Sequence, residues 1–323
     1  MITYLEAIRL AQQKALATDP RVFLYGQDIG NFGGAFKATK NLAAEFPGRV
    51  LDAPLSEDAI VGMAIGAAIE GARPIVEMQF ADFSTCGLNQ IVNHAGTLFY
   101  RTGVPCPIVV RLPSGGTSGG GPFHSQSLEA IYAHWPGLVV VTPATVEDAY
   151  TMLLEAVALD DPVVFCEHKF LYYHLKAESL PETSLPIGKA RIAHSGSKAS
   201  IVTYGAAVHW ALKTCEAGNL DAEVIDLRTL LPWDKEAVAG SVKKTGRVLL
   251  QKNLAPEYFG EGIAELNGKL YQLTWKNQVG FVYDAKTLKK INELYWPYEG
   301  WGLTHNDTSL IVSTGESNIY FIV

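Results

Sequence analysis

Six short apolar runs in the first half of the chain constrain the fold more than any other feature. Val and Ile dominate them without alternating with polar residues, as expected of parallel strands covered on both faces. Helical stretches or Gly-rich loops separate the runs, and this alternation predicts a doubly wound α/β sheet in a domain of residues 1–178. The predicted strands cover residues 21–25, 49–52, 74–80, 107–112, 138–142 and 162–166.

A second, smaller α/β unit is predicted beyond a linker. Residues 179–186 are rich in proline and polar side chains, which indicates a connecting segment. The chain that follows predicts three strands and two helices. These begin an α/β domain without completing it, so residues 185–251 are interpreted as a partial domain. The strands are expected at 199–204, 222–227 and 247–251, and the helices at 206–217 and 233–240.

From Lys252 onward the alternation of strands and helices stops, and a β-rich segment begins. Strand-length runs here alternate with a period of two. Residues 267–273 resemble 306–312 at an offset of about 39 residues, which is the size of one β-propeller blade. Because a propeller needs roughly four to eight blades, residues 254–323 are predicted to be a propeller fragment. We expect residues 185–323 to be marginally stable in isolation.

Composition excludes several functional classes. The formal net charge of −7 without a basic run argues against a nucleic-acid surface, and no apolar run reaches the ~18 residues of a membrane-spanning helix. Four widely separated cysteines without a CxxC pair indicate reduced thiols rather than a disulfide framework or a zinc site. The chain opens on a capping box, Thr3 to Glu6, rather than a signal peptide, so we expect a cytoplasmic protein.

Glu57 stands at a position where α/β proteins bind ligands. The strand at 49–52 leads through Pro54 to Ser56, a good N-cap, and two acids follow on the first turn of a helix, where the dipole favours negative charge. The helix behind them is almost wholly small and apolar, so we expect it to be buried on most sides. A carboxylate on the carboxyl side of a strand suits a ligand site, although a solvated first-turn acid fits the same position.

Two further stretches follow predicted strands. Residues 114–127 form a Gly-rich loop that matches neither a dinucleotide fingerprint nor a P-loop. His124 near its end suits either proton transfer or bracing of the loop. After the third strand, Gln79 and Phe83 offer a hydrogen bond and an aromatic face to a flat heterocycle, with a core position for Phe83 as the alternative. The other histidines lack the spacing of a metal site.

Five motifs occur in the same order in one known family. On these motifs, the chain from Met1 to about Gln251 resembles the β subunit of the E1 component of 2-oxo acid dehydrogenase complexes. These are thiamine-diphosphate-dependent decarboxylases of the pyruvate and branched-chain types, with a transketolase-like fold. The motifs are Tyr25-Gly26-Gln27-Asp28, Pro54-Leu55-Ser56-Glu57, Gln79-Phe80-Ala81-Asp82-Phe83, Gln90-Ile91-Val92-Asn93-His94 and Pro122-Phe123-His124-Ser125-Gln126-Ser127.

The resemblance implies a role for each candidate residue. In this family the acid matching Glu57 hydrogen-bonds N1′ of the cofactor's aminopyrimidine, so Glu57 is expected to activate the cofactor. The residues matching Leu55, Gln79 and Phe83 contact the pyrimidine ring. The histidine matching His124 faces the substrate and the lipoyl arm, and assists proton transfer during acyl transfer.

The resemblance also implies partners. An E1 α subunit holds the diphosphate and Mg²⁺ of the cofactor through a GDG motif, which this sequence lacks. The α2β2 heterotetramer then acts on a small 2-oxo acid and passes the acyl group to the lipoyl domain of the E2 core. Some relatives hold a structural K⁺ through backbone carbonyls, which are expected here at Leu159 and Asp161. No nucleic acid or membrane partner is expected.

The tail resembles a different family, the β-propeller glutaminyl-peptide cyclotransferases. In that family the acid matching Glu261 is catalytic, and the tryptophan matching Trp301 lines the pocket. The chain therefore looks like a junction of two unrelated genes. Cyclisation by the tail, or a non-functional fusion, is the alternative to E1 activity. The resemblance is carried by Tyr258-Phe259-Gly260-Glu261-Gly262, by residues 269–276 and by Gly300-Trp301-Gly302-Leu303-Thr304.

Overall fold

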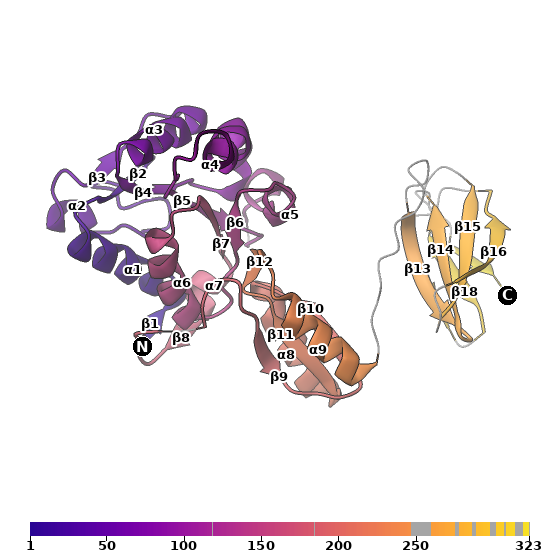
Figure 1. The fold of residues 1–323 in the computed structure, drawn as a ribbon. Helices are drawn as coiled ribbons and strands as arrows, with labels where there is room; N and C mark the ends of the chain where they lie inside the picture. The colour runs from indigo at the N-terminus through magenta and orange to yellow at the C-terminus, as the bar shows by residue number, and fades with distance from the viewer. Residues whose placement is uncertain are drawn as a thin grey trace. The chain divides into compact units, whose positions relative to one another are not determined.

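In the computed structural model of the protein, the chain divides into two units, Met1–Val248 and Leu249–Val323. Figure 1 shows the first unit as layered helices and strands and the second as strands alone. The structure describes residues 1–117, 119–183, 185–246, 260–274, 278–285, 289–297, 302–306, 308–313 and 319–322.

A seven-stranded sheet forms the centre of the first unit, and all six predicted apolar runs belong to it. Its order is β12-β6-β7-β5-β4-β2-β3, and the strands β2 to β7 run parallel, which confirms the predicted fold class. The antiparallel edge strand β12 comes from the second half of the chain and was not predicted. The bounds are β2 (Val22–Gly26), β3 (Val50–Asp52), β4 (Arg73–Glu77), β5 (Val109–Ser114), β6 (Val139–Val141), β7 (Val163–His168) and β12 (Thr229–Leu231).

Helices cover both faces of this sheet, as a doubly wound fold requires (Figure 1). On one face α1 and α6 pack together against the sheet, and on the other α3 and the short helices after it bury their apolar sides. The strands are therefore apolar on both faces, which explains the lack of alternation in their sequences. The helices are α1 (Tyr4–Thr18), α2 (Leu42–Glu45), α3 (Glu57–Ile69), α4 (Gly96–Thr102), α5 (Glu129–Ala133), α6 (Val146–Ala158) and α7 (Leu171–His174).

The two helix starts singled out from the sequence are capped differently. Thr3 Oγ1 accepts a hydrogen bond from the Glu6 amide at 3.1 Å, which confirms half of the predicted capping box. The Glu6 carboxylate bonds Arg9 at 2.7 Å instead of turning back to Thr3. Ser56 precedes α3, but its hydroxyl makes no capping bond, so the predicted side-chain cap is wrong at that helix.

The prediction that α3 is buried on most sides is also wrong. Ile60, Ala64 and Ala68 face the core, whereas Met63 is 61% exposed and Ile69 is 47% exposed. Because the helix is apolar all round, its pattern gives no sign of which face is left outside. Within the described part of the chain, α3 therefore keeps an uncovered apolar face.

A three-stranded sheet follows in the second part of the same unit. Its order is β10-β11-β9, with β10 parallel and β9 antiparallel to the central strand. The predicted strands and helices are present, and β9 was not foreseen; the strand expected at 247–251 lies outside the described residues. The elements are β9 (Arg191–His194), β10 (Ala199–Thr203), α8 (Ala206–Gly218), β11 (Ala222–Asp226) and α9 (Lys235–Thr245), while β1 (Ile2–Thr3) pairs with β8 (Lys176–Ala177) near the amino terminus.

A buried arginine ties this second sheet to the first. Arg228 is fully buried, and its guanidinium donates to Asp148 on α6 at 2.9 Å and to the carbonyl of Lys189 at 2.8 Å. Arg191 on β9 also donates to Asp148, at 2.8 Å. Together with the pairing of β12 on β6, these contacts hold the second sheet against α6 and the edge of the first sheet.

The second unit consists of antiparallel strands in two sheets, β13-β14-β15-β16 and β17-β18-β19. The predicted repeat is visible in it, because the turn at Asn267 lies between β13 and β14 and the turn at Asn306 between β17 and β18. Leu273, Trp296 and Val312 form a small shared core. The strands are β13 (Gly260–Leu266), β14 (Lys269–Thr274), β15 (Val279–Asp284), β16 (Lys290–Tyr295), β17 (Gly302–His305), β18 (Leu310–Ser313) and β19 (Ile319–Ile322).

Candidate functional site

Three predicted site residues and Gln27, which was not among them, lie along one edge of the seven-stranded sheet. Gln27 follows β2, Glu57 starts the helix after β3, Gln79 follows β4, and His124 lies in the loop after β5. These strands are parallel, so their carboxyl ends meet at the same edge. Open α/β sheets bind their ligands at that edge.

Glu57 is oriented by a glutamine that sequence reasoning did not single out. Gln27 Nε2 donates to Glu57 Oε1 at 3.1 Å. Gln27 is 5% exposed, and its Oε1 atom is buried without a hydrogen-bond partner among the described residues. Glu57 itself is half-buried at the first turn of α3. The pair therefore places an oriented, half-buried carboxylate at this edge of the sheet.

The other pyrimidine-contact candidates flank this pair. Gln79 Nε2 donates to Asp28 Oδ2 at 3.2 Å, so the ends of β4 and β2 are joined across the site. Asp28 adopts a left-handed conformation, with φ of 56°. Leu55 is 86% exposed just before α3, so no described residue covers it.

Phe83 and His124 lie in one aromatic cluster, although the sequence places them on separate segments. The His124 ring contacts the rings of Phe80 and Phe83 edge to face, with centroid distances of 4.6 and 5.5 Å. Phe80 and Phe83 are 5.6 Å apart. His124 is partly exposed at the end of its loop, so it is held by ring packing while still open to a substrate.

A buried ion network lies beneath the site. Arg111 on β5 is fully buried and donates to Glu77 on β4 at 2.5 Å and to Glu167 on β7 at 2.5 and 2.8 Å. Tyr172 donates to Glu167 at 2.7 Å. Burial raises the pKa of Glu77, and the Arg111 guanidinium opposes that rise. A methyl group on Gly34 would stand 2.6 Å from Glu77 Oε1, so the loop after β2 rests directly on this network.

The carbonyl of Leu159, predicted as a K⁺ ligand, already meets a cation. Arg73 Nη1 donates to the carbonyl oxygens of Val157 at 2.9 Å and Leu159 at 2.8 Å, and Nη2 donates to Asp160. A guanidinium thus supplies positive charge and donors where the ion was expected. The Leu159 carbonyl thus has one donor already, and K⁺ binding at Leu159 and Asp161 stays a prediction.

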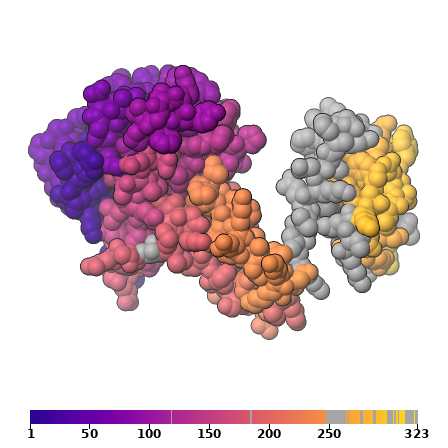
Figure 2. Space-filling model, viewed as in Figure 1, coloured from indigo at the N-terminus to yellow at the C-terminus, as the bar shows by residue number. Residues whose placement is uncertain are grey.

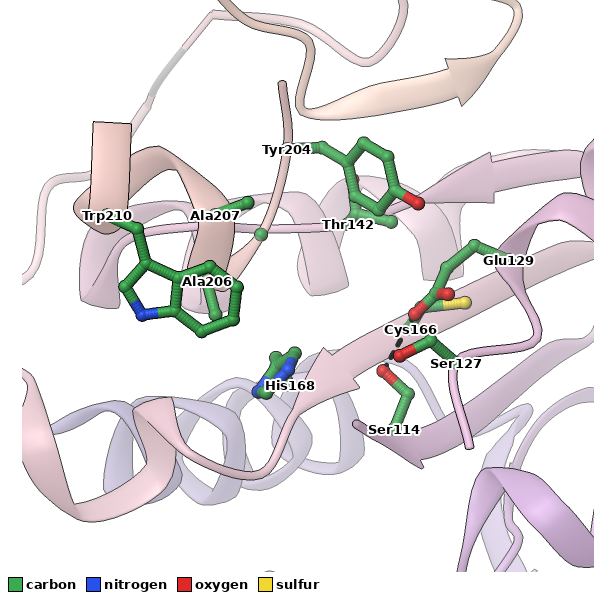
Figure 3. Close-up of a pocket in the computed structure, with 11 residues that line it drawn as sticks. Ser114, Ser127, Glu129, Thr142, Cys166, His168, Tyr204, Ala206, Ala207 and Trp210 are labelled. Atoms are coloured by element: carbon green, nitrogen blue, oxygen red, sulfur yellow. Dashed lines mark hydrogen bonds between the residues drawn. The ribbon is translucent and has the colours of Figure 1, made fainter. Parts of the chain in front are cut away.

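A cavity of about 190 Å³ lies at the carboxyl ends of β5, β6 and β7, beside the start of α8 (Figure 3). Ser114 and Ser127, the two ends of the glycine loop, line it, and Ser114 donates to the buried Glu129 at 2.9 Å. Burial, with Lys169 adding to it, lowers the pKa of His168 to about 4. Both ends of the loop that carries His124 thus border this cavity.

Large apolar side chains are exposed around the site. Leu55, Met63, Phe99, Tyr100 and Phe123 are each more than half exposed, and Tyr100 reaches 93%. Figure 2 shows the segment around α3 and α4, in purple, as an outer surface of the first unit. Exposed apolar surface of this kind beside a ligand site is typical of a surface that a partner covers.

The two candidate residues of the tail are described little or not at all. Trp301 is outside them, and of Glu261 only its place on β13 is described. Among the described residues, no helix is long and apolar enough to cross a membrane. In the same residues, no three His, Cys, Asp or Glu side chains are grouped to hold a metal ion.

Comparison with known proteins defines the class of this site. The family model of the transketolase pyrimidine-binding domain matches residues 1–174. A solved structure, a split-gene transketolase described as an inactive beta4 tetramer, has the same fold, with a TM-score of 0.63, 23% identity and coverage of 76% of this chain and 77% of its own. The first unit therefore contains a transketolase-type pyrimidine-binding domain.

Two curated relatives narrow the class. The 2-oxoisovalerate dehydrogenase subunit beta of Bacillus subtilis (strain 168) is 47% identical over 257 residues, which cover 77% of this chain and 79% of that protein. The pyruvate dehydrogenase E1 component subunit beta of Mycoplasma pneumoniae is 43% identical over 276 residues, 83% of this chain and 84% of that protein. The chain belongs to the family of β subunits of 2-oxo acid dehydrogenase E1 components.

The tail matches another family. The glutamine cyclotransferase family model covers residues 234–323, so its match begins before residue 254, where the sequence motifs placed the resemblance. It overlaps α9, which packs with β10 and β11 in the first unit. The chain thus joins an E1 β subunit to a cyclotransferase-like segment, as the motifs predicted.

Proposed function

We propose that the chain acts as the β subunit of an E1 enzyme. With an α subunit, in an α2β2 heterotetramer, it binds thiamine diphosphate, decarboxylates pyruvate or a branched-chain 2-oxo acid, and transfers the acyl group to the lipoyl domain of E2. The observation that carries the proposal is the Glu57–Gln27 pair, 3.1 Å apart at the carboxyl edge of a parallel sheet in a pyrimidine-binding domain.

The described residues fit the aminopyrimidine half of the cofactor. Thiamine diphosphate, when bound, supplies the nucleophilic carbon that attacks the 2-oxo group. Glu57, oriented by Gln27, shares a proton with the ring nitrogen N1′, a role that requires a partly desolvated and fixed carboxylate. Gln27, which is almost fully buried, holds this carboxylate in place from the end of β2.

The remaining candidates bind and orient. Leu55 and Phe83 supply apolar contact to the ring, and Gln79 supplies a hydrogen bond. His124, packed between Phe80 and Phe83, faces the substrate and moves a proton during acyl transfer. Its partial exposure supports this role, because a lipoyl arm has to reach it.

The site is half of a complete one. The sequence has no GDG motif for the diphosphate and Mg²⁺, so we assign both to the α subunit. Leu55 and the outer face of α3 are apolar and exposed, which supports docking of a partner subunit at this edge. All four cysteines are free thiols, which supports action in a reducing compartment such as the cytoplasm.

Reconstitution with a partner tests the proposal. The full chain is co-expressed with the α subunit of a closely related E1, and the purified complex is assayed for thiamine-diphosphate binding and for decarboxylation of pyruvate and 2-oxoisovalerate with an artificial electron acceptor. The chain alone and the α subunit alone serve as negative controls, and the α subunit with its own β subunit as the positive control.

We expect decarboxylation only when both subunits are present. The preferred substrate identifies the branch of the family to which the chain belongs. Formation of a heterotetramer that neither binds thiamine diphosphate nor decarboxylates either substrate would contradict the proposal. A chain that fails to form any complex, while the positive control does, would favour a non-functional fusion.

A further inference from the structure

Asp82 is a buried carboxylate that joins two parts of the site. It lies in the short turn Ala81–Gly87, immediately before Phe83, and is 6% exposed. Its Oδ1 atom accepts hydrogen bonds from the backbone amides of Ser125 and Gln126, both at 3.2 Å. These are the two residues that follow His124. One side chain therefore connects the turn that carries Phe83 to the loop that carries His124.

The second carboxylate oxygen of Asp82 is left without a partner. Oδ2 is buried and accepts no hydrogen bond from any described residue. Such an oxygen is costly to bury, so a native structure keeps it only with a compensating charge or for a functional reason. The buried Lys169 supplies part of the charge: burial lowers the pKa of Lys169 to about 8, and the fields of Asp82 and Glu129 hold it from falling further.

Lys169 and Asp82 hold opposite ends of the glycine loop. Lys169 Nζ donates to the Pro113 carbonyl at 3.0 Å, just before the loop. The Gly115 amide donates to the Gln126 carbonyl at 2.9 Å and closes the neck of the loop. Asp82 completes the arrangement at the far end, next to His124. Among the described residues, ring packing, this neck and a bond from the His124 amide to the Gly121 carbonyl at 3.4 Å are the other contacts that hold His124.

We propose that Asp82 is a positioning residue that fixes His124 against Phe83 by holding the two amides that follow it. The inference rests on the proposed function, in which Phe83 contacts the cofactor and His124 the substrate. Because the efficiency of catalysis depends steeply on the placement of the reacting groups, a shift of this loop relative to the turn lowers turnover. Asp82 acts through the backbone and touches neither reactant.

Three variants of the full chain test the inference. Asp82→Ala removes both acceptors, and Asp82→Asn keeps one neutral oxygen that can still accept from the amides. Ser84→Ala is the matched control, because Ser84 lies in the same turn and is also buried, yet among the described residues its hydroxyl bonds Tyr132 and the Ala81 carbonyl and not the loop. All three change the turn, but only the Asp82 variants remove or weaken the hydrogen bonds to the loop.

Two readouts are taken. Hydrogen–deuterium exchange of the free full chain, followed by mass spectrometry, measures protection of the peptides that cover residues 119–127 and needs no partner or cofactor. Steady-state kinetics and thiamine-diphosphate binding of the complex with an α subunit give kcat, KM and Kd. The exchange experiment therefore tests whether Asp82 holds the loop even if the complex shows no activity. An inactive complex would count against the proposed function alone.

We expect Asp82→Ala to speed exchange in these peptides by about tenfold or more, since two hydrogen bonds to a charged acceptor are lost. kcat should fall by at least about tenfold with cofactor Kd and KM within about twofold, and Asp82→Asn should recover part of both losses. Ser84→Ala should change neither readout. Unchanged exchange in Asp82→Ala, or equal loss of protection in Ser84→Ala, would overturn the inference. If Asp82→Ala does not fold, Asp82→Leu replaces it, because leucine has a similar size but no acceptor for the two amides, and wild-type exchange and kcat in that variant overturn the inference as well.

Discussion

The buried network beneath the site leads to a quantitative prediction about Arg111. This guanidinium is fully buried between Glu77 and Glu167 and makes four hydrogen bonds to side chains, three of them to carboxylates. In Arg111→Met, two buried carboxylates lose their counter-charge at once. Among the described residues, Glu77 keeps no other ion-pair partner, while Glu167 keeps the hydroxyl of Tyr172.

The expected loss follows from known buried pairs. Removing one partner of a buried ion pair destabilises a protein by about 3–5 kcal/mol, because a buried charge is left uncompensated. We therefore expect Arg111→Met to lower the free energy of unfolding of the first unit by about 4 kcal/mol. For a domain of this size that lowers Tm by about 8–16 °C.

Thermal and urea unfolding of the full chain, followed by far-UV circular dichroism, measures this loss. Arg21→Met removes an exposed pair with Asp19 and should leave Tm almost unchanged. Adding Glu77→Met to Arg111→Met removes one of the stranded carboxylates and should recover part of the loss. A loss below about 1 kcal/mol, or a double variant less stable than the single one, would refute the reasoning.

Two further predictions concern neighbouring groups. Burial lowers the pKa of His168 from 6.5 to about 4, so below pH 6.5 the unfolded state binds the extra proton, and stability falls with decreasing pH until about pH 4. Between pH 6.5 and pH 4, His168→Asn should lose less stability than the wild type, and the difference should be up to about 2 kcal/mol because His168 is partly exposed. A pH dependence equal to that of the wild type would contradict this prediction. Arg73→Met should destabilise by about 1–3 kcal/mol because the carbonyls of Val157 and Leu159 lose their donor. Recovery of the stability of Arg73→Met by KCl but not by choline chloride would support K⁺ binding at these carbonyls. Wild-type stability of Arg73→Met without added salt would refute the role of Arg73.

The positions and the parallel direction of the main strands could be predicted because the signal for them is local. A strand covered on both faces has to be apolar throughout, and the six runs carry that signal. β12 carries none, since only three residues, Thr229–Leu231, add an antiparallel edge to a sheet built far earlier in the sequence. Its place depends on Arg228, a long-range contact to α6 that no sequence period encodes.

The candidate site was predicted in its residues but not in its connections. Glu57 and His124 stand out by position, whereas Gln27 and Asp82 are ordinary polar residues inside the recognised motifs, and only the fold shows what they bond. The outer face of α3 was assigned wrongly for a related reason. An apolar residue such as Met63 gives the same pattern whether its own chain or a partner covers it.

The repeat in the tail was predictable because an asparagine stands at the same place in both turns, at Asn267 and Asn306. Asn306 Oδ1 accepts from the amides of Thr308 and Ser309, a side-chain turn that the sequence pattern already favours. The beginning of the match to the cyclotransferase family was not predictable from the motifs. The match includes α9, whereas the motifs that carry the resemblance begin only at Tyr258.

The central claim is that Glu57 acts on a thiamine cofactor shared with an α subunit. The direct measurement compares kcat for 2-oxo acid decarboxylation by reconstituted complexes that carry the wild-type chain, Glu57→Gln, or Glu70→Gln at the far end of the same helix. We predict that Glu57→Gln still assembles but loses activity by about a hundredfold or more, as expected when an acid–base group is removed, and that Glu70→Gln matches the wild type. Full activity in Glu57→Gln would contradict the account.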